Sequence, residues 1–91
     1  MTGTIVGTGS AINIRTVGFR PVLVEVYNVT GLCFGKWAKT MADAAAVKVI
    51  TAGTVSFVTS DGITPLSNGF TFGADSDLNV AAETVHWIAY E

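Results

Sequence analysis

The sequence predicts an all-β fold, a single small β-sandwich or barrel of short antiparallel strands. Short runs of β-branched and aromatic residues follow one another along the 91 residues, separated at near-regular spacing by Gly, Asn, Asp and Pro. This pattern is typical of sandwiches and barrels. Only residues 40–46 have good helix propensity, and so short a segment cannot form an independent helix. We therefore expect at most one helical turn there, within one domain.

The first half of the chain divides into a glycine-rich segment and three expected strands. Residues 1–10 contain three glycines around Ile5 and Val6, which indicates an N-terminal arm or edge strand preceding a β domain at residues 11–91. We expect strands over 11–17, 22–29 and 33–39. Pro21 breaks the chain between the first two because it cannot donate a ladder hydrogen bond. Both faces of 22–29 are partly apolar, which predicts a central strand.

The second half contains two further expected strands and one strongly patterned unit. Strands are predicted over 47–50 and 53–59, followed by a turn at Ser60-Asp61-Gly62 and irregular or edge structure to Asn68. The unit runs from Gly69 to Tyr90. In it, a short strand, an Asp/Asn-rich loop and an alternating strand from Glu83 indicate a hairpin-like arrangement.

The composition indicates that the chain associates with itself or with a larger partner. Apolar residues make up 49% of the sequence and charged residues 13%, against about 25% charged in an average domain. So small a domain has little interior in which to bury this apolar surface, which favours an assembly. The alternative is a monomer with scattered exposed apolar residues.

Charge and hydropathy limit the kinds of partner that the chain is expected to bind and the compartment in which it is expected to be made. The net charge is −2 and the five basic residues are scattered, so the sequence has no electrostatic footprint for nucleic acid. No run of 18 apolar residues predicts a membrane span. The first ten residues lack the pattern of a signal peptide, so we expect synthesis in the cytoplasm without export by that route.

The sequence contains no pattern that predicts catalysis or a cofactor. No dinucleotide-binding, phosphate-binding, zinc-protease or hydrolase motif is present. Cys33 lies between Leu32 and Phe34 and is expected to be a small buried hydrophobe. His86 is expected to be a packed or surface residue, with a pH-sensitive subunit contact as the alternative. A nucleophile–base pair of Cys33 and His86 would require the fold to bring them together. We therefore expect a protein that is not an enzyme.

The loop after the first strand of the Gly69–Tyr90 unit could bind a cation. Asp75, Asp77 and Asn79 alternate, so in an extended segment their oxygens would share one face, where Glu83 could join them. The spacing fails as an EF-hand, because the glycine and the final glutamate are missing. The favoured interpretation is that these side chains bond neighbouring backbone groups in a turn.

The same unit carries a resemblance to a β-rich module of tailed-bacteriophage virion proteins. The resembling segments are Asn68–Asn79, Glu83-Thr84 and Trp87–Tyr90, with upstream agreement at Gly7–Ser10, Gly18–Pro21, Val24–Tyr27, Trp37 and Thr59–Thr64. They cover nearly the whole chain. Ala82 departs from the pattern, which has Gly before Glu-Thr. If that position needs a positive φ, the turn here is expected to differ slightly.

The resemblance implies a virion structural protein on the capsid surface. The expected form is a decoration (cement) protein that binds the outer shell, contacts the major capsid protein and forms a homo-oligomer, with a trimer favoured. Apolar residues of the N-terminal half are expected to face the shell and aromatic residues to anchor the contact: Ile5, Val6, Ile12 and Ile14, with Tyr27, Trp37 and Trp87. The alternative is a tail-associated adhesin that recognises a host glycan or protein through the Asp61-Gly62 and Asp75–Asn79 loops.

Overall fold

A computed structural model describes residues 1–91 and shows an all-β domain of eight strands. The strands are β1 (Thr2–Val6), β2 (Ile12–Ile14), β3 (Leu23–Asn28), β4 (Cys33–Ala38), β5 (Ala45–Val49), β6 (Val55–Leu66), β7 (Gly69–Phe72) and β8 (Thr84–Tyr90). The structure contains no helix long and apolar enough to cross a membrane. The predicted all-β class is therefore confirmed.

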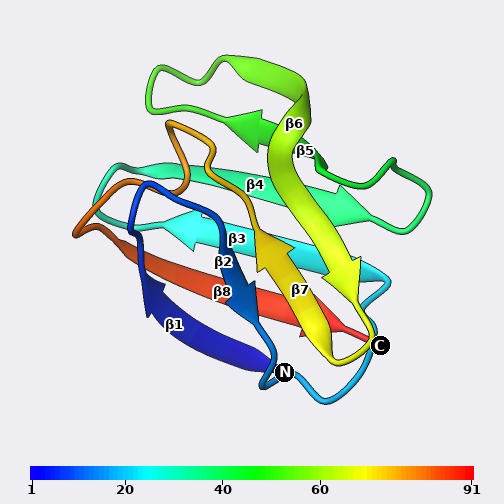
Figure 1. Ribbon diagram of the computed structural model, residues 1–91. Coiled ribbons are helices and arrows are strands. Elements are labelled where there is room, and N and C mark those ends of the chain that lie inside the picture. The colour runs from blue at the N-terminus through cyan, green and yellow to red at the C-terminus, as the bar shows by residue number, and fades with distance from the viewer.

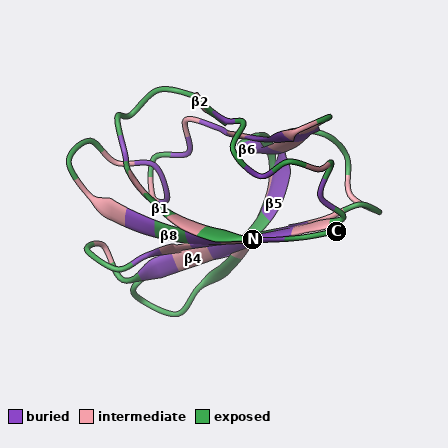
Figure 2. Cartoon of the chain, turned by 90° about the horizontal axis from the view of Figure 1, so that it is seen from below, coloured by how far each residue is buried: buried purple, intermediate pink, exposed green.

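All strands belong to one antiparallel sheet that curls over itself into a half-barrel. The strand order is β1-β8-β3-β4-β5-β6-β7-β2, so β1 and β2 are the two edges. In Figure 1, β7, β2 and the second half of β6 pass in front of β8, β3 and β4. We call the first group the front layer and the second group the back layer. Figure 2 shows the same two layers almost edge-on, with β5 rising between them. The strand predicted over 22–29 is β3, which lies centrally between β8 and β4, as its two apolar faces indicated.

The predicted turn at Ser60-Asp61-Gly62 is wrong, because this segment is a bulge within β6. Ala46 pairs with Val58 while the adjacent Ala45 pairs with Ile63, so residues 59–62 have no partners on β5. Asp61 takes a positive φ of 60°, and the Gly62 N–H donates to the Ala44 carbonyl at 2.9 Å. A bulge bends a strand and increases its twist. The turn residues therefore carry β6 from the back layer into the front layer without reversing the chain.

The expected hairpin between Gly69 and Tyr90 is also wrong. β7 pairs with β6 and β2, whereas β8 pairs with β1 and β3. Residues 73–83 instead cross from the front layer to the back layer. Ala82, within this crossing, has a φ of 67°. The turn thus keeps the left-handed conformation that glycine would favour, with alanine in its place.

The segment with helix propensity contains no helical turn. Ala44 has a φ of 66°, and β5 begins at Ala45. Ala45 and Ala46 are fully buried. Burial in the sheet therefore outweighs the helix propensity of these alanines, as tertiary contacts commonly do.

The core lies between the two layers. Phe70 and Phe72 of β7 face Val24, Val26 and Trp87 of the back layer, and all of these are buried. The rings of Phe70 and Trp87 meet edge to face, with centroids 5.4 Å apart. Side chains that alternate with these core residues point away from the core, on the side of the sheet that no other layer covers.

Candidate functional site

The most extensive feature available to a partner is the uncovered side of the back layer. We define the outer face as the set of apolar side chains that β8, β3, β4, β5 and the start of β6 direct away from the core. They are Leu23, Tyr27, Phe34, Val47, Val49, Val55, Phe57, Ile88 and Tyr90. The burial patterns of β3, β4 and β8 alternate, and these positions are the less buried ones. The outer face is therefore a direct consequence of strand periodicity.

The antiparallel register aligns the outer face in rows across the strands. Tyr27 lies opposite Phe34, Phe34 opposite Val49, and Val49 opposite Val55. The rings of Tyr27 and Phe34 have centroids 5.7 Å apart. Cross-strand aromatic and β-branched neighbours of this kind stabilise a sheet, and here they also form an apolar row across β3, β4, β5 and β6.

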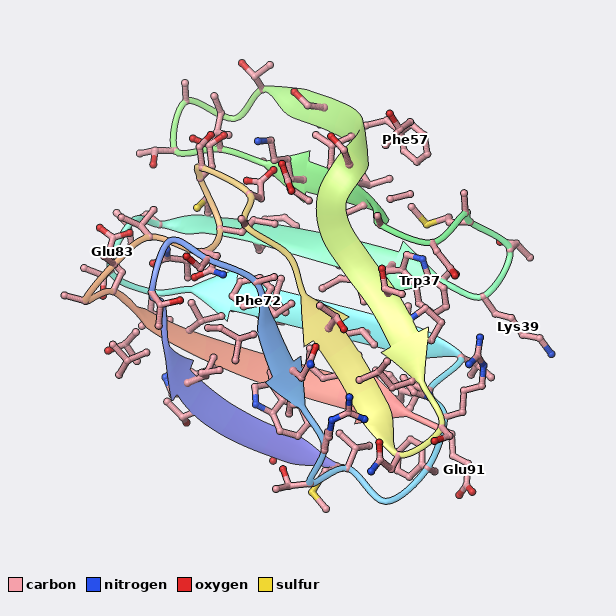
Figure 3. All side chains as sticks on the ribbon, in the orientation of Figure 1. Trp37, Lys39, Phe57, Phe72, Glu83 and Glu91 are labelled. Carbon is pink, nitrogen blue, oxygen red and sulfur yellow. The ribbon has the colours of Figure 1, made fainter.

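The exposed part of the outer face is concentrated at β5 and β6. Val55 is 66% exposed, Phe57 59% and Val47 37%, and Tyr90 of β8 is 43% exposed. Figure 3 shows Phe57 projecting beyond the ribbon, whereas Phe72 lies within it. These gathered exposed apolar side chains make the outer face the candidate site for contact with another molecule.

The charged groups on the outer face neutralise one another. Glu25 accepts a hydrogen bond from the Tyr27 hydroxyl, and its carboxylate lies 3.6 Å from the Lys36 ammonium. The bond from Tyr27 is the main cause that holds the pKa of Glu25 below its usual value, against the opposing effect of desolvation. The same bond raises the pKa of Tyr27 to about 12. Only 13% of the Glu25 side chain is exposed, so a partner would meet little unpaired charge.

The aromatic residues expected to anchor a partner fall into two groups. Tyr27 is part of the outer face and is half-buried. Trp37 and Trp87 are 2% and 4% exposed and belong to the core. The Trp37 indole N–H donates to the Ala42 carbonyl at 3.0 Å. The two tryptophans thus hold the layers together and offer no surface to a partner of the folded chain.

The apolar residues expected to face a shell are mostly turned inward. Ile14 is buried in the core, and Ile5 and Ile12 pack partly against it. Only Val6 is exposed, at 56%. The segment is not an arm that leaves the domain, because residues 2–6 pair with β8 throughout. The exposed apolar surface therefore lies chiefly on the sheet and not in residues 1–14.

In the acidic loop at residues 75–79, the carboxylates of Asp75 and Asp77 bind the ammonium group of a lysine of the same chain. The Lys48 ammonium lies 3.1 and 3.0 Å from the two carboxylate oxygens of Asp75 and 2.6 Å from Asp77. Asp75 also accepts the backbone N–H groups of Asp77 and Leu78. Desolvation alone would lower the pKa of Lys48, but the hydrogen bonds to Asp77 and Asp75 outweigh it and raise that pKa. These bonds use the carboxylates that we considered for a cation site.

Asn79 points to a different part of the molecule. Its side-chain oxygen accepts the N–H groups of Thr8 and Gly9, at 2.9 and 3.3 Å, and its NH2 group donates to the carbonyls of Ser10 and Gly73. Asn79 is 1% exposed. It therefore fastens the β1–β2 connection to the crossing loop. The favoured interpretation of this motif, turn side chains that satisfy backbone groups, describes what Asp75 and Asn79 do.

Cys33 and His86 lie on opposite sides of the sheet. Cys33 is buried, and its thiol donates to the Asp77 carbonyl at 2.9 Å. Desolvation, with smaller effects from Asp77 and Glu83, raises the pKa of this thiol, which disfavours the reactive thiolate. His86 is exposed on the other side, 3.3 Å from the Thr4 hydroxyl. The structure thus separates the one nucleophile–base pair that the sequence offered.

Sequence reasoning did not single out Val47, Val55 and Phe57 as candidate contact residues, and the structure shows that they are exposed. Each lies in a run that was expected to form a strand, but strand alternation does not tell which of the two faces is covered. The available signal was composition, since the excess of apolar residues required some apolar surface to stay exposed. No protein-family model, curated protein or solved structure matches this chain.

Proposed function

We propose that this chain is a structural protein of a tailed-bacteriophage virion, a decoration (cement) protein bound to the outer surface of the capsid. Its partner would be the major capsid protein, and the role requires no catalysis and no cofactor. The resemblance of residues 68–90 and of the upstream segments to phage virion modules suggests the class. The exposed outer face is the single structural observation on which the proposed binding mode rests.

The outer face suits a stable contact with a large protein surface. Burying apolar surface contributes roughly 25 cal/mol per Å2, and Val55, Phe57 and Val47 still have much of their surface to bury. Aromatic residues, phenylalanine among them, are enriched in protein interfaces. A protein that binds only the assembled shell stabilises that shell by mass action. The proposed contact therefore moves from Ile5, Ile12 and Ile14 to the outer face.

The adhesin alternative has less support from the geometry. Asp75 and Asn79 are buried and already hydrogen-bonded within the domain, so they are not available to a glycan. Asp61, at the β6 bulge, is exposed, and Asp77 is partly exposed but already bonded to Lys48. An isolated bulge offers few groups for recognition, whereas the outer face extends over β8, β3, β4, β5 and the start of β6.

The test is binding of outer-face variants to capsid shells that lack the chain. Phe57→Asp places a charge in the exposed part of the proposed contact, and Ser67→Asp adds the same charge at an exposed position outside it. Co-sedimentation with shells should show at least a tenfold loss of affinity for Phe57→Asp and none for Ser67→Asp. Both variants should unfold as the unmodified chain does, since both positions are exposed. Equal binding by the two variants would overturn the assignment of the outer face.

A further inference from the structure

The free edge of β1 is an unused set of backbone hydrogen-bonding groups. The Met1 carbonyl accepts the Ala89 N–H at 2.8 Å, and the Gly7 N–H donates to the Glu83 carbonyl at 2.8 Å. Odd-numbered residues of β1 therefore bond to β8. In an antiparallel ladder the direction alternates from residue to residue, so Thr2, Thr4 and Val6 direct their N–H and C=O groups away from β8.

This edge lacks the charges, prolines and bulges that commonly prevent edge strands from pairing. Residues 2–6, Thr-Gly-Thr-Ile-Val, include no charge and no proline. The register with β8 is unbroken from Thr2 to Val6, so no bulge twists the edge away. Natural β proteins protect exposed edges with such devices because an unprotected edge recruits another strand. The opposite edge, β2, has only three residues and is followed directly by Arg15.

The space beside β1 is open. A groove of about 470 Å3 lies between β1 and the β2 segment, with Ile5 and Trp87 among the residues that line it. The groove thus leaves space for side chains of an added strand that point toward the core side.

We propose that β1 pairs antiparallel with β1 of a second copy of this chain, about a two-fold axis at Thr4. In this register Thr4 faces Thr4 of the copy, and Thr2 faces Val6 of the copy. All the outward N–H and C=O groups of Thr2, Thr4 and Val6 then find partners, in about six hydrogen bonds. Ile5 of the copy lies opposite Gly3, where it can enter the groove beside Trp87.

A second copy fits this edge better than an unrelated strand for two reasons. In the register centred on Thr4, Ile5 of each copy lies opposite Gly3 of the other, which has no side chain, so the two segments are self-complementary. No charged residue in residues 2–6 would face a like charge across the axis. The axis is perpendicular to the sheet, so both outer faces lie on the same side of the dimer and together present one extended apolar surface.

The test compares Thr4→Pro with Thr4→Ala in the full chain, by sedimentation equilibrium. Proline removes the Thr4 N–H, which forms no ladder bond to β8, and edge strands tolerate proline at such positions. Alanine keeps the N–H and removes only the side chain. The unmodified chain and Thr4→Ala should have twice the 9.5 kDa mass of one chain, and Thr4→Pro should weaken self-association at least tenfold while unfolding at a similar temperature.

A second variant keeps the proposal testable if Thr4→Pro fails to fold. Thr4→Lys leaves the backbone intact, and Thr4 is exposed, but it would place two ammonium groups opposite each other at the axis. It should also give monomers. A monomeric unmodified chain at tens of micromolar would overturn the proposal. So would a trimer, or self-association that is unchanged in Thr4→Pro and Thr4→Lys.

Discussion

Lys48 of β5 donates to both carboxylate oxygens of Asp75, and this ion pair joins the back layer to the loop that crosses between the layers. The side chains are 11% and 6% exposed, so both charges are largely removed from water. Removing one partner of a buried pair leaves an uncompensated charge, whereas exposed pairs contribute little.

Lys48→Met should therefore destabilise the domain by about 3 kcal/mol. Lys36→Met is the matched control, because Lys36 is 51% exposed and its distance to Glu25 is 3.6 Å. The control should change the free energy of unfolding by less than about 1 kcal/mol. Urea unfolding measures both. Equal effects would show that the loop does not depend on the buried ion pair.

Ala82→Gly should stabilise the domain. Ala82 has a φ of 67°, in the left-handed region that costs a residue with a Cβ about 1 kcal/mol or more. Glycine removes that cost, although it also gains entropy in the unfolded chain. Ala81→Gly is the control, since Ala81 has no positive φ and should lose stability. Thermal unfolding that ranks Ala82→Gly below the unmodified chain would contradict the left-handed turn.

The bulge in β6 should not tolerate a side chain at Gly62. A Cβ at this position would clash with the backbone carbonyl of Ala45, which cannot move without disturbing β5. Gly62→Ala should therefore cost about 2–3 kcal/mol, as overpacking does. Ser60→Ala, at an exposed position of the same bulge, should be nearly neutral. A tolerated Gly62→Ala would mean that β6 does not bend in this way.

Alkaline titration should resolve the bond between Tyr27 and Glu25. Absorbance of tyrosinate should show one tyrosine ionising near pH 12, and Glu25→Gln should lower that pKa toward the ordinary value of about 10. Because the folded-state pKa is raised, the stabilisation is complete below about pH 10 and is lost as the pH rises toward 12. Tyr27→Phe should remove the late step. Persistence of that step in Tyr27→Phe would assign it elsewhere.

The strands could be predicted from the sequence because alternation and β-branched residues are local signals. Which strands pair with one another could not be predicted. Ser60-Asp61-Gly62 has the composition of a turn, but tertiary contacts with Ala44 and Ala45 use the same residues for a bulge. The Gly69–Tyr90 unit looked like a hairpin because its strands are adjacent in sequence, whereas their partners come from β2, β6, β1 and β3. Non-local pairing leaves no trace in spacing.

The sequence predicted that an apolar interaction surface exists, but not which residues form it. The high apolar fraction indicated an interaction surface, and the side chains of Asp75 and Asn79 proved to be turn elements as their type suggests. Trp37 and Trp87 could serve equally as core or as anchor from sequence alone. In the structure the front layer covers both tryptophans, so they are part of the core. Phe57 was left exposed because nothing covers the back of β5 and β6.

The proposed function is tested most directly by counting and locating the chain in purified phage particles. Quantitative mass spectrometry gives the copy number, and a density map of the particle gives the position and orientation. We expect hundreds of copies on the shell, with the β8-β3-β4-β5 surface and Phe57 toward the capsid. A handful of copies at the tail tip, or none in the particle, would contradict the assignment as a decoration protein.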